Sequence, residues 1–187
     1  METEAYRAPE DKGCHAYNNK RTKRTEAFWC DAGCWYVYKI YMPTNKCLNI
    51  VAAEKGTPQA ALIRACEPLE GILKMQEFTN KVGKNKPAEI RGLTNGPGKC
   101  GRALDIGVDY STYDFCEEGN DDAYIEEEIG YELGDDDIVE TFRINIDYAE
   151  EFRFKPWRFF IKGSKCVSKK VQTREQIIQQ GLKKGKK

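Results

Sequence analysis

The chain has 187 residues and a formal net charge of zero at pH 7, because 30 basic residues balance 30 acidic ones. Hydrophobic residues make up 40% of it, with three Trp, ten Tyr and eight Phe, which predicts one folded domain and excludes a disordered chain. The sequence lacks the run of about 18 apolar residues that a membrane span needs, and its start lacks the apolar core of a secretory signal. We therefore expect a soluble, intracellular protein.

The zero net charge hides a strong segregation of charge along the chain. Acidic residues concentrate over 117–140, and basic residues over 20–24, 81–102 and 162–187. Such blocks are typical of solvated faces and tails. They also allow local binding of a polyanion that the net charge does not reveal.

The first predicted element is a strand over residues 2–7. Side chains alternate between the two faces of a strand, so Glu2, Glu4 and Tyr6 lie on the same face, and Glu4 and Tyr6 are about 7 Å apart. A loop rich in Pro, Gly and Lys follows over residues 8–25. A carboxylate and a phenol on one face are candidates for chemistry, although a single Glu at a strand start is usually solvated.

Residues 34–53 predict a β-hairpin, with two β-rich runs on either side of a turn at Pro43, Thr44 and Asn45. Tyr36 and Tyr38 face the same way in its first arm. The remaining predicted elements are a strand over 60–69, a helix over 68–78, a Gly/Pro loop opening a short helix over 96–107, strands over 140–154 and 155–164, and a terminal helix over 173–184 with a capping box at Thr173 and Gln176.

This order of elements predicts an α+β fold: a single domain with a curved mixed or antiparallel sheet, flanking helices and a protruding β-hairpin. Regular βαβ alternation is missing, which argues against a doubly wound sheet. The segment NGPGK is not a nucleotide phosphate loop, because its first glycine is one position too far upstream and Cys100 stands where Ser or Thr would bind magnesium. Lys99 could still hold a backbone phosphate of a nucleic acid.

Eight cysteines are spread along the chain in unrelated contexts. Only Cys30 and Cys34 are close in sequence, and CDAGC does not have the Cys-x-x-Cys spacing of a zinc site. We therefore interpret the cysteines as free thiols and expect no cofactor and no metal. A partial metal site of Cys14, His15, Cys30 and Cys34 is the open alternative.

The motifs ETEAY, PED with His15, YVYKIY, CLNI, LIRACEPLEG, NGPGKCGRAL and KPWRFFIKGSKCVS occur in an order that resembles the alkyladenine (3-methyladenine) DNA glycosylases of the mammalian type. The resemblance extends from Glu2 to about Ser168. It implies a glycosylase-like domain over residues 1–168, with an acidic insertion at about 117–140, followed by a C-terminal helix and basic tail over 169–187. Family members have strands upstream of ETEAY, so the chain resembles an N-terminally shortened member, and the position of Glu4 relative to the sheet edge is left open.

The resemblance implies three catalytic positions. Glu4 matches the general base that activates a water against the glycosidic carbon. Arg64 matches the arginine that helps to hold this water and the carboxylate. Ile144 takes the place of a valine whose backbone carbonyl supports the same water.

The resemblance also implies the DNA contacts. Four residues match those that contact a flipped base: Tyr6, His15, Tyr38 and Asn49. Asn49 matches the asparagine that crowds the amino group of normal guanine. Tyr41, with Met42 beside it, matches the hairpin tip that enters the minor groove and fills the gap left by the base. Arg24 and Lys99 are the expected contacts to the DNA backbone.

We therefore predict a monofunctional, monomeric DNA glycosylase of base excision repair, located in the nucleus, that acts on alkylated or deaminated purines in duplex DNA. No lysine nucleophile is needed, so the product is an abasic site without strand cleavage. The hairpin tip YMPTNKC is one residue longer than is usual, and Glu26 stands where the family tends to carry a basic residue. Two alternatives follow: a catalytically weak or inactive lesion-binding relative, and a module that binds a small molecule or a protein.

Overall fold

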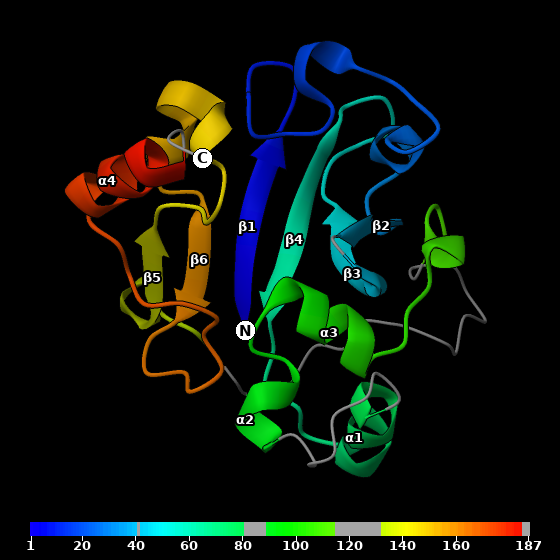
Figure 1. The fold of residues 1–187 in the computed structure, drawn as a ribbon. Helices are drawn as coiled ribbons and strands as arrows, with labels where there is room; N and C mark the ends of the chain where they lie inside the picture. The colour runs from blue at the N-terminus through cyan, green and yellow to red at the C-terminus, as the bar shows by residue number, and fades with distance from the viewer. Residues whose placement is uncertain (41, 81–88, 115–131, 185–187) are drawn as a thin grey trace.

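Six strands form one sheet in the order β2-β3-β4-β1-β6-β5, and every neighbouring pair is antiparallel (Figure 1). The structure is a computed structural model that describes residues 1–40, 42–80, 89–114 and 132–184. The strands are β1 (Glu2–Arg7), β2 (Trp35–Ile40), β3 (Met42–Val51), β4 (Gln59–Ala65), β5 (Ile138–Thr141) and β6 (Arg158–Ile161). The α+β prediction is confirmed, and of the two predicted kinds of sheet the antiparallel one is found.

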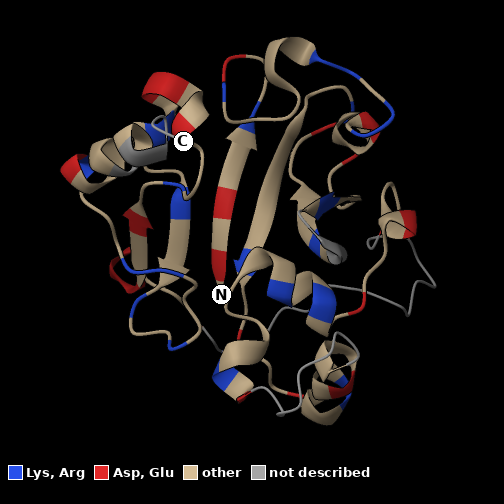
Figure 2. Cartoon of the chain, viewed as in Figure 1, with Lys and Arg blue, Asp and Glu red and all other residues tan. Residues whose placement is uncertain are grey.

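The first strand of the chain lies in the interior of the sheet. Glu4 is opposite Leu62 of β4 on one side and opposite Arg158 of β6 on the other. The acidic residues of β1 therefore lie in the middle of the fold (Figure 2), and the side chains of Glu2 and Glu4 are fully buried. This settles the position of Glu4, which is held in the sheet from both sides instead of lying at an edge.

Strand β2 pairs with β3 from Trp35 opposite Ile50 to Lys39 opposite Lys46. β3 begins at Met42, so residues 43–45, which the sequence predicted as a turn, lie within the strand. Tyr41 lies outside the described residues. On one face of these strands an apolar cluster forms from alternate residues, as the period of two predicts: Trp35, Val37, Leu48 and Ile63.

The helices are α1 (Ile72–Asn80), α2 (Ile90–Leu93), α3 (Pro97–Ala103) and α4 (Arg174–Lys184), of which the first three gather at one end of the sheet (Figure 1). Gly101 allows α3 to approach β3, since a Cβ atom there would lie 2.3 Å from the carbonyl oxygen of Lys46. The capping box of α4 is confirmed: Thr173 and Gln176 exchange backbone-to-side-chain hydrogen bonds of 3.0 and 3.3 Å. None of the described helices is long and apolar enough to cross a membrane.

The predicted strand over 140–154 is wrong for most of its length. β5 ends at Thr141, and residues Asp147–Phe154 form a 3-10 helix, η5. Asn145 and Glu150 have positive φ angles of 60° and 50°, which interrupt an extended chain although the alternation of FRINI suggests one. Of the predicted acidic insertion over 117–140, residues 117–131 lie outside the described residues, and its last three residues, 138–140, belong to β5.

Two other boundaries shift. The predicted strand over 60–69 ends at Ala65, and the predicted helix over 68–78 begins only at Ile72. Pro68 and the positive φ of 66° at Gly71 lie in the connection between them. This connection leads the chain away from β4 after Ala65, so Arg64 is the last residue but one of the strand, and its side chain faces the two buried carboxylates.

Candidate active site

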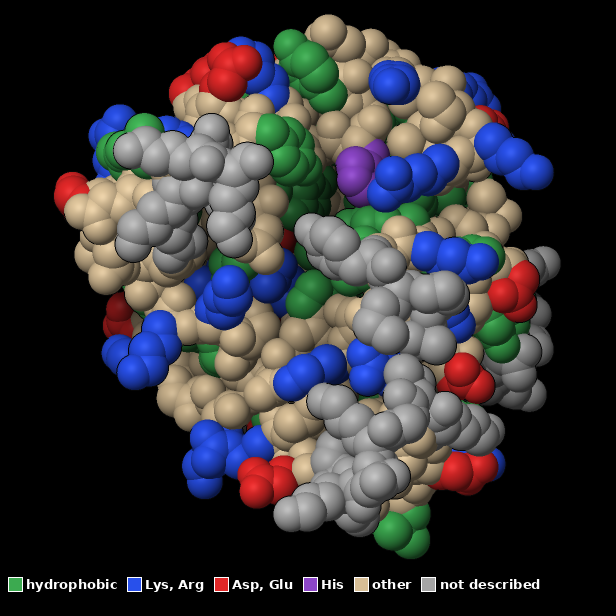
Figure 3. Space-filling model, in the orientation of Figure 1, with side chains coloured by type: hydrophobic (Ala, Val, Ile, Leu, Met, Phe, Trp, Pro, Cys, Tyr) green, Lys and Arg blue, Asp and Glu red, His purple; other side chains and the backbone are tan. Residues whose placement is uncertain are grey.

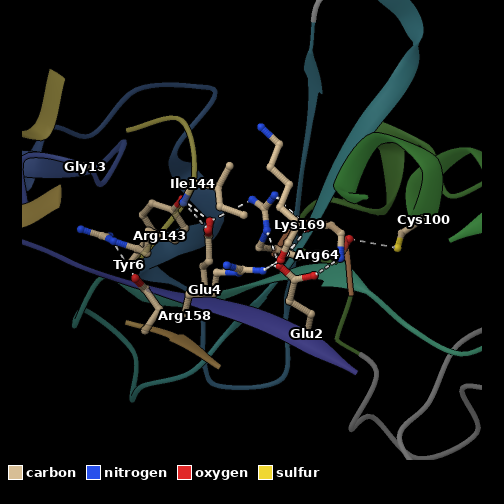
Figure 4. A network of polar contacts seen from close by, with 12 residues as sticks. Glu2, Glu4, Tyr6, Gly13, Arg64, Cys100, Arg143, Ile144, Arg158 and Lys169 are labelled. Carbon is tan, nitrogen blue, oxygen red and sulfur yellow. Dashed lines mark hydrogen bonds and ion pairs between the residues drawn. The ribbon is translucent and has the colours of Figure 1, made fainter. Parts of the chain in front are cut away.

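Glu4 is a fully buried carboxylate that accepts hydrogen bonds from three different elements (Figure 4). The backbone N–H of Ile144 donates to Oε1 at 2.7 Å. The hydroxyl of Tyr6, on the same strand, donates to Oε2 at 2.8 Å, and Nη1 of Arg64 on β4 donates to the same oxygen at 3.2 Å. The sequence-predicted catalytic residues Glu4, Arg64 and Ile144 are therefore in direct contact.

The arrangement around Glu4 leaves acceptor capacity on one oxygen. A carboxylate offers about four lone-pair positions. Among the described residues, Oε2 receives two donors and Oε1 receives one. Oε1 can therefore accept one further hydrogen bond. A water that donates to this vacant lone pair would be placed to lose its proton to Glu4.

A second carboxylate, Glu2, lies on the same face of β1 and forms ion pairs with Arg64 and Arg158. Nε of Arg64 and Nε of Arg158 donate to its Oε1 at 2.9 and 2.7 Å. Burial raises the pKa of Glu2, but the hydrogen bonds from the backbone of Ser168 and from Arg158, with the charges of both arginines, outweigh it, so the pKa lies below its ordinary value. Burial likewise lowers the pKa of Arg64, and the neighbouring Glu4 and Glu2 raise it above the ordinary value.

A separate buried ion pair, between Asp11 and Arg143, packs against the ring of Tyr6. Arg143 donates to both carboxylate oxygens of Asp11 at 2.6 and 2.8 Å, and both side chains are fully buried. The guanidinium of Arg143 also donates to the carbonyl oxygen of Ala5 at 3.0 Å and stacks over the ring of Tyr6 at 4.7 Å. The loop after β1, the strand itself and the segment after β5 are thus joined at Arg143.

Aromatic side chains line a small cavity that is joined to Glu4 through Tyr6, which lines the cavity and donates to Glu4. Its volume is about 30 Å³, room for about one water molecule. It is lined by Tyr6, Gly13, His15, Phe28, Tyr36, Tyr38, Asn49 and Tyr148. A wider cleft of about 310 Å³ adjoins it through Tyr6, Tyr38 and Tyr148 and reaches Arg64 and Ile144. All four predicted base-contacting residues are thus brought together.

His15 faces the cavity from the loop after β1. Its Nδ1 lies 2.8 Å from the hydroxyl of Tyr36, and its ring meets that of Tyr38 edge-on at 4.7 Å between centroids. Burial, with the charge of Arg24, lowers the pKa of His15 to about 4, so the imidazole is neutral at pH 7. On the surface, the single histidine side chain lies beside a basic side chain and an apolar hollow (Figure 3). Nη2 of Arg24 is 3.5 Å from Nε2 of His15.

The remaining predicted residues have different positions. Asn49 is buried in β3 and donates to the carbonyl oxygen of Tyr36 at 2.9 Å. Arg24 stacks over Tyr38 at 4.8 Å, at the rim of the aromatic cavity. Lys99 is exposed on α3 and donates to Asn95 at 2.6 Å. Tyr41 and the side chain of Met42 lie outside what the structure describes.

Six residues of the site were not found from the sequence: Glu2, Asp11, Arg143, Tyr148, Arg158 and Ser168. Glu2 had a usable signal, because the strand alternation places it on the face of Glu4. Tyr148 is 63% exposed at the cavity, and its hydroxyl donates to the carbonyl oxygen of Gly13 at 3.3 Å. The Asp11–Arg143 pair joins residues 132 positions apart, and no local pattern predicts such a contact.

The alternative of a metal site is not found in the structure. Within the described part of the chain no group of three or more His, Cys, Asp or Glu side chains is placed to hold a metal ion. The cysteines there are free thiols: Cys14, Cys30, Cys34, Cys47, Cys66, Cys100 and Cys166.

A buried carboxylate with a vacant acceptor position, beside a cavity walled by aromatic rings, is the arrangement of a hydrolase that acts next to a planar ring. Comparison with known proteins agrees with this class. A model of the methylpurine-DNA glycosylase family matches residues 1–165, so the chain belongs to this family and is a DNA glycosylase of base excision repair.

Individual relatives support the same assignment. Proteins named "Putative 3-methyladenine DNA glycosylase" from Clostridium acetobutylicum, Desulfitobacterium hafniense and Natranaerobius thermophilus are 45%, 42% and 41% identical to the chain. The matches cover 90–91% of the chain and 80–81% of the relatives. All three are bacterial, so the expected likeness to the mammalian type and the expected N-terminal shortening have no support from them.

Proposed function

We propose that this monomeric protein releases alkylated purines, 3-methyladenine among them, from duplex DNA by hydrolysing the N-glycosidic bond. The observation that carries the proposal is the buried Glu4, whose oxygens accept three hydrogen bonds from the described residues, which leave one acceptor position vacant on Oε1. A water bound there transfers a proton to Glu4 as its oxygen attacks the glycosidic carbon. No amine nucleophile takes part, so an abasic site remains in an unbroken strand.

Arg64 and Tyr6 act on Glu4 from the other oxygen. Both donate to Oε2, which leaves Oε1 for the water. Arg64 is itself held by Glu2, so its guanidinium has a fixed orientation. Arg64 on β4 and Ile144 in the segment after β5 are distant in sequence, and their contacts with Glu4 assemble the site only in the folded chain.

The base reaches this site only after leaving the duplex, at a cost of a few kcal/mol that is smallest for damaged pairs. The cavity of about 30 Å³ is too small for a purine, so aromatic side chains at its mouth move when the base enters. His15 and Tyr148 are the candidates for this movement, because they lie on the loop after β1 and on η5, outside the sheet. Alkylated purines carry positive charge, which the faces of Tyr6 and Tyr38 favour.

The β2–β3 hairpin supplies the DNA-inserting residues in this proposal. Tyr41 enters the minor groove with Met42 and offsets part of the stacking lost when the base leaves. Arg24, exposed at the rim of the cavity, and Lys99 on α3 contact phosphates. Retention of duplex DNA that weakens steeply as salt is added is the expected behaviour.

The test measures purines released from DNA treated with a methylating agent, separated by chromatography, with Glu4→Gln and Glu10→Gln compared side by side. Both variants make the same chemical change, but Glu4 is buried in the site and Glu10 is exposed. We expect release to fall by at least about 100-fold in the first and to stay unchanged in the second. Release by Glu4→Gln at the wild-type rate contradicts the role of Glu4. If the wild type binds damaged duplex but releases no base, the lesion-binding alternative holds.

A further inference from the structure

Cys66 and Cys100 face each other where α3 meets the end of β4. Their Sγ atoms are 4.0 Å apart. Cys66 follows β4 directly, and Cys100 lies in the middle of α3. Neither thiol lines the aromatic cavity or the wider cleft, so the proposed mechanism uses neither.

The two thiols differ in their surroundings. Cys100 is fully buried, and its sulfur lies 3.0 Å from the carbonyl oxygen of Thr94 and 3.6 Å from that of Arg64. Cys66 is half-buried, and its backbone carbonyl accepts a hydrogen bond from the hydroxyl of Thr94. Cys66 is therefore the more exposed residue of the pair, and Cys100 is closed off from solvent.

We propose that Cys66 and Cys100 are a redox-active pair, in which a hydroperoxide oxidises Cys66 and Cys100 then closes a disulfide. In the first step the Cys66 sulfur attacks the peroxide, the O–O bond breaks, and Cys66 becomes a sulfenic acid while the peroxide is reduced to an alcohol or water. In the second step the Cys100 sulfur displaces the sulfenic oxygen, the S–S bond forms, and the oxygen leaves as water with the Cys100 proton.

The electrostatics assign these two roles. The hydrogen bond from Cys100 lowers the pKa of Cys66, although burial opposes this, so Cys66 is the thiol of the pair that ionises more readily. The same contact and burial raise the pKa of Cys100 far above its ordinary value, and it stays protonated until it attacks. Closure to a bond of about 2.05 Å requires the sulfurs to approach by roughly 2 Å. Cys66 can supply this movement because it lies outside regular structure.

The test is peptide mapping of the whole folded chain. The protein is treated with hydrogen peroxide at pH 7, free thiols are alkylated in denaturant, and trypsin is added. Cleavage after Arg64, Lys74, Lys99 and Arg102 gives residues 65–74 and 100–102, each with a single cysteine. We expect a linked species of these two peptides that disappears on reduction with dithiothreitol. The readout is a mass, so it does not depend on the proposed glycosylase activity.

Matched variants sharpen the result. Cys66→Ser abolishes the linked species, whereas Cys30→Ser, which changes another half-buried thiol, leaves it intact. The rate of linkage rises with pH, because the thiolate of Cys66 is the form that attacks the peroxide. Linkage of residues 65–74 to 166–169, which carry Cys166, overturns the pairing. Recovery of both peptides fully alkylated after peroxide overturns the proposal altogether.

Discussion

The hydroxyl of Tyr6 donates a hydrogen bond of 2.8 Å to Oε2 of Glu4. One contact thus joins the aromatic wall of the cavity to the candidate catalytic carboxylate, two residues apart on the same face of β1. Burial, and next the charge of Glu4, raise the pKa of Tyr6 well above its ordinary value. The phenol therefore remains protonated, and a hydrogen-bond donor, at neutral pH.

Tyr6→Phe removes this donor and keeps the ring. A hydrogen bond to a charged group contributes about 1.5 kcal/mol or more, so we expect the single-turnover rate of base release to fall by about 10-fold. Binding to a duplex that contains an abasic site should change by less than about threefold, because the ring that lines the cavity is retained. Tyr17→Phe, outside the site, is the matched control. An unchanged rate in Tyr6→Phe would show that the contact does not act on Glu4.

Asp11→Ala leaves the buried guanidinium of Arg143 without its carboxylate. Breaking a buried pair from one side costs about 3–5 kcal/mol, and we expect a loss of that size in the free energy of unfolding by urea. Glu26→Ala is the control, because it breaks the exposed pair with Arg21 and should have no measurable effect. Equal stability of the two variants would mean that solvent reaches Arg143.

The sequence predicted the parts of this site that depend on strand alternation and on the family's motifs. Alternation placed Glu4 and Tyr6 on one face, and the motifs supplied Arg64 and Ile144. The sequence could not show that β1 lies between β4 and β6, because the pairing of strands more than fifty residues apart leaves no local pattern in the sequence. The extended appearance of FRINI hid the positive φ of Asn145, which directly follows the residue whose N–H donates to Glu4.

The ionisation of Glu2 makes the free energy of unfolding depend on pH. The pKa of Glu2 is lowered in the folded state, so the unfolded chain binds a proton at this residue more readily. The resulting stabilisation is present above the ordinary carboxyl pKa of 4.5 and is lost as the pH falls through the lower pKa of the folded state. Urea unfolding of the wild type at pH 7, 5, 4 and 3 should show stability falling below about pH 4.5. Glu2→Gln should be less stable at pH 7 and should fall less steeply with acid. Parallel curves for the two proteins contradict this assignment.

His15 provides a direct check on the electrostatics of the cavity, because it is the single histidine of the chain. Its pKa is lowered to about 4 by burial and then by the charge of Arg24. The folded state therefore resists protonation between the ordinary value of 6.5 and about 4, and the contribution of His15 to stability is lost as pH falls through this window. The imidazole C2–H resonance followed by NMR should titrate near pH 4. Arg24→Gln removes the second cause and should raise the midpoint, whereas Lys23→Gln, its exposed neighbour, should not. A midpoint near 6.5 in the wild type would mean that water fills the space around the ring and that the cavity is open before DNA binds.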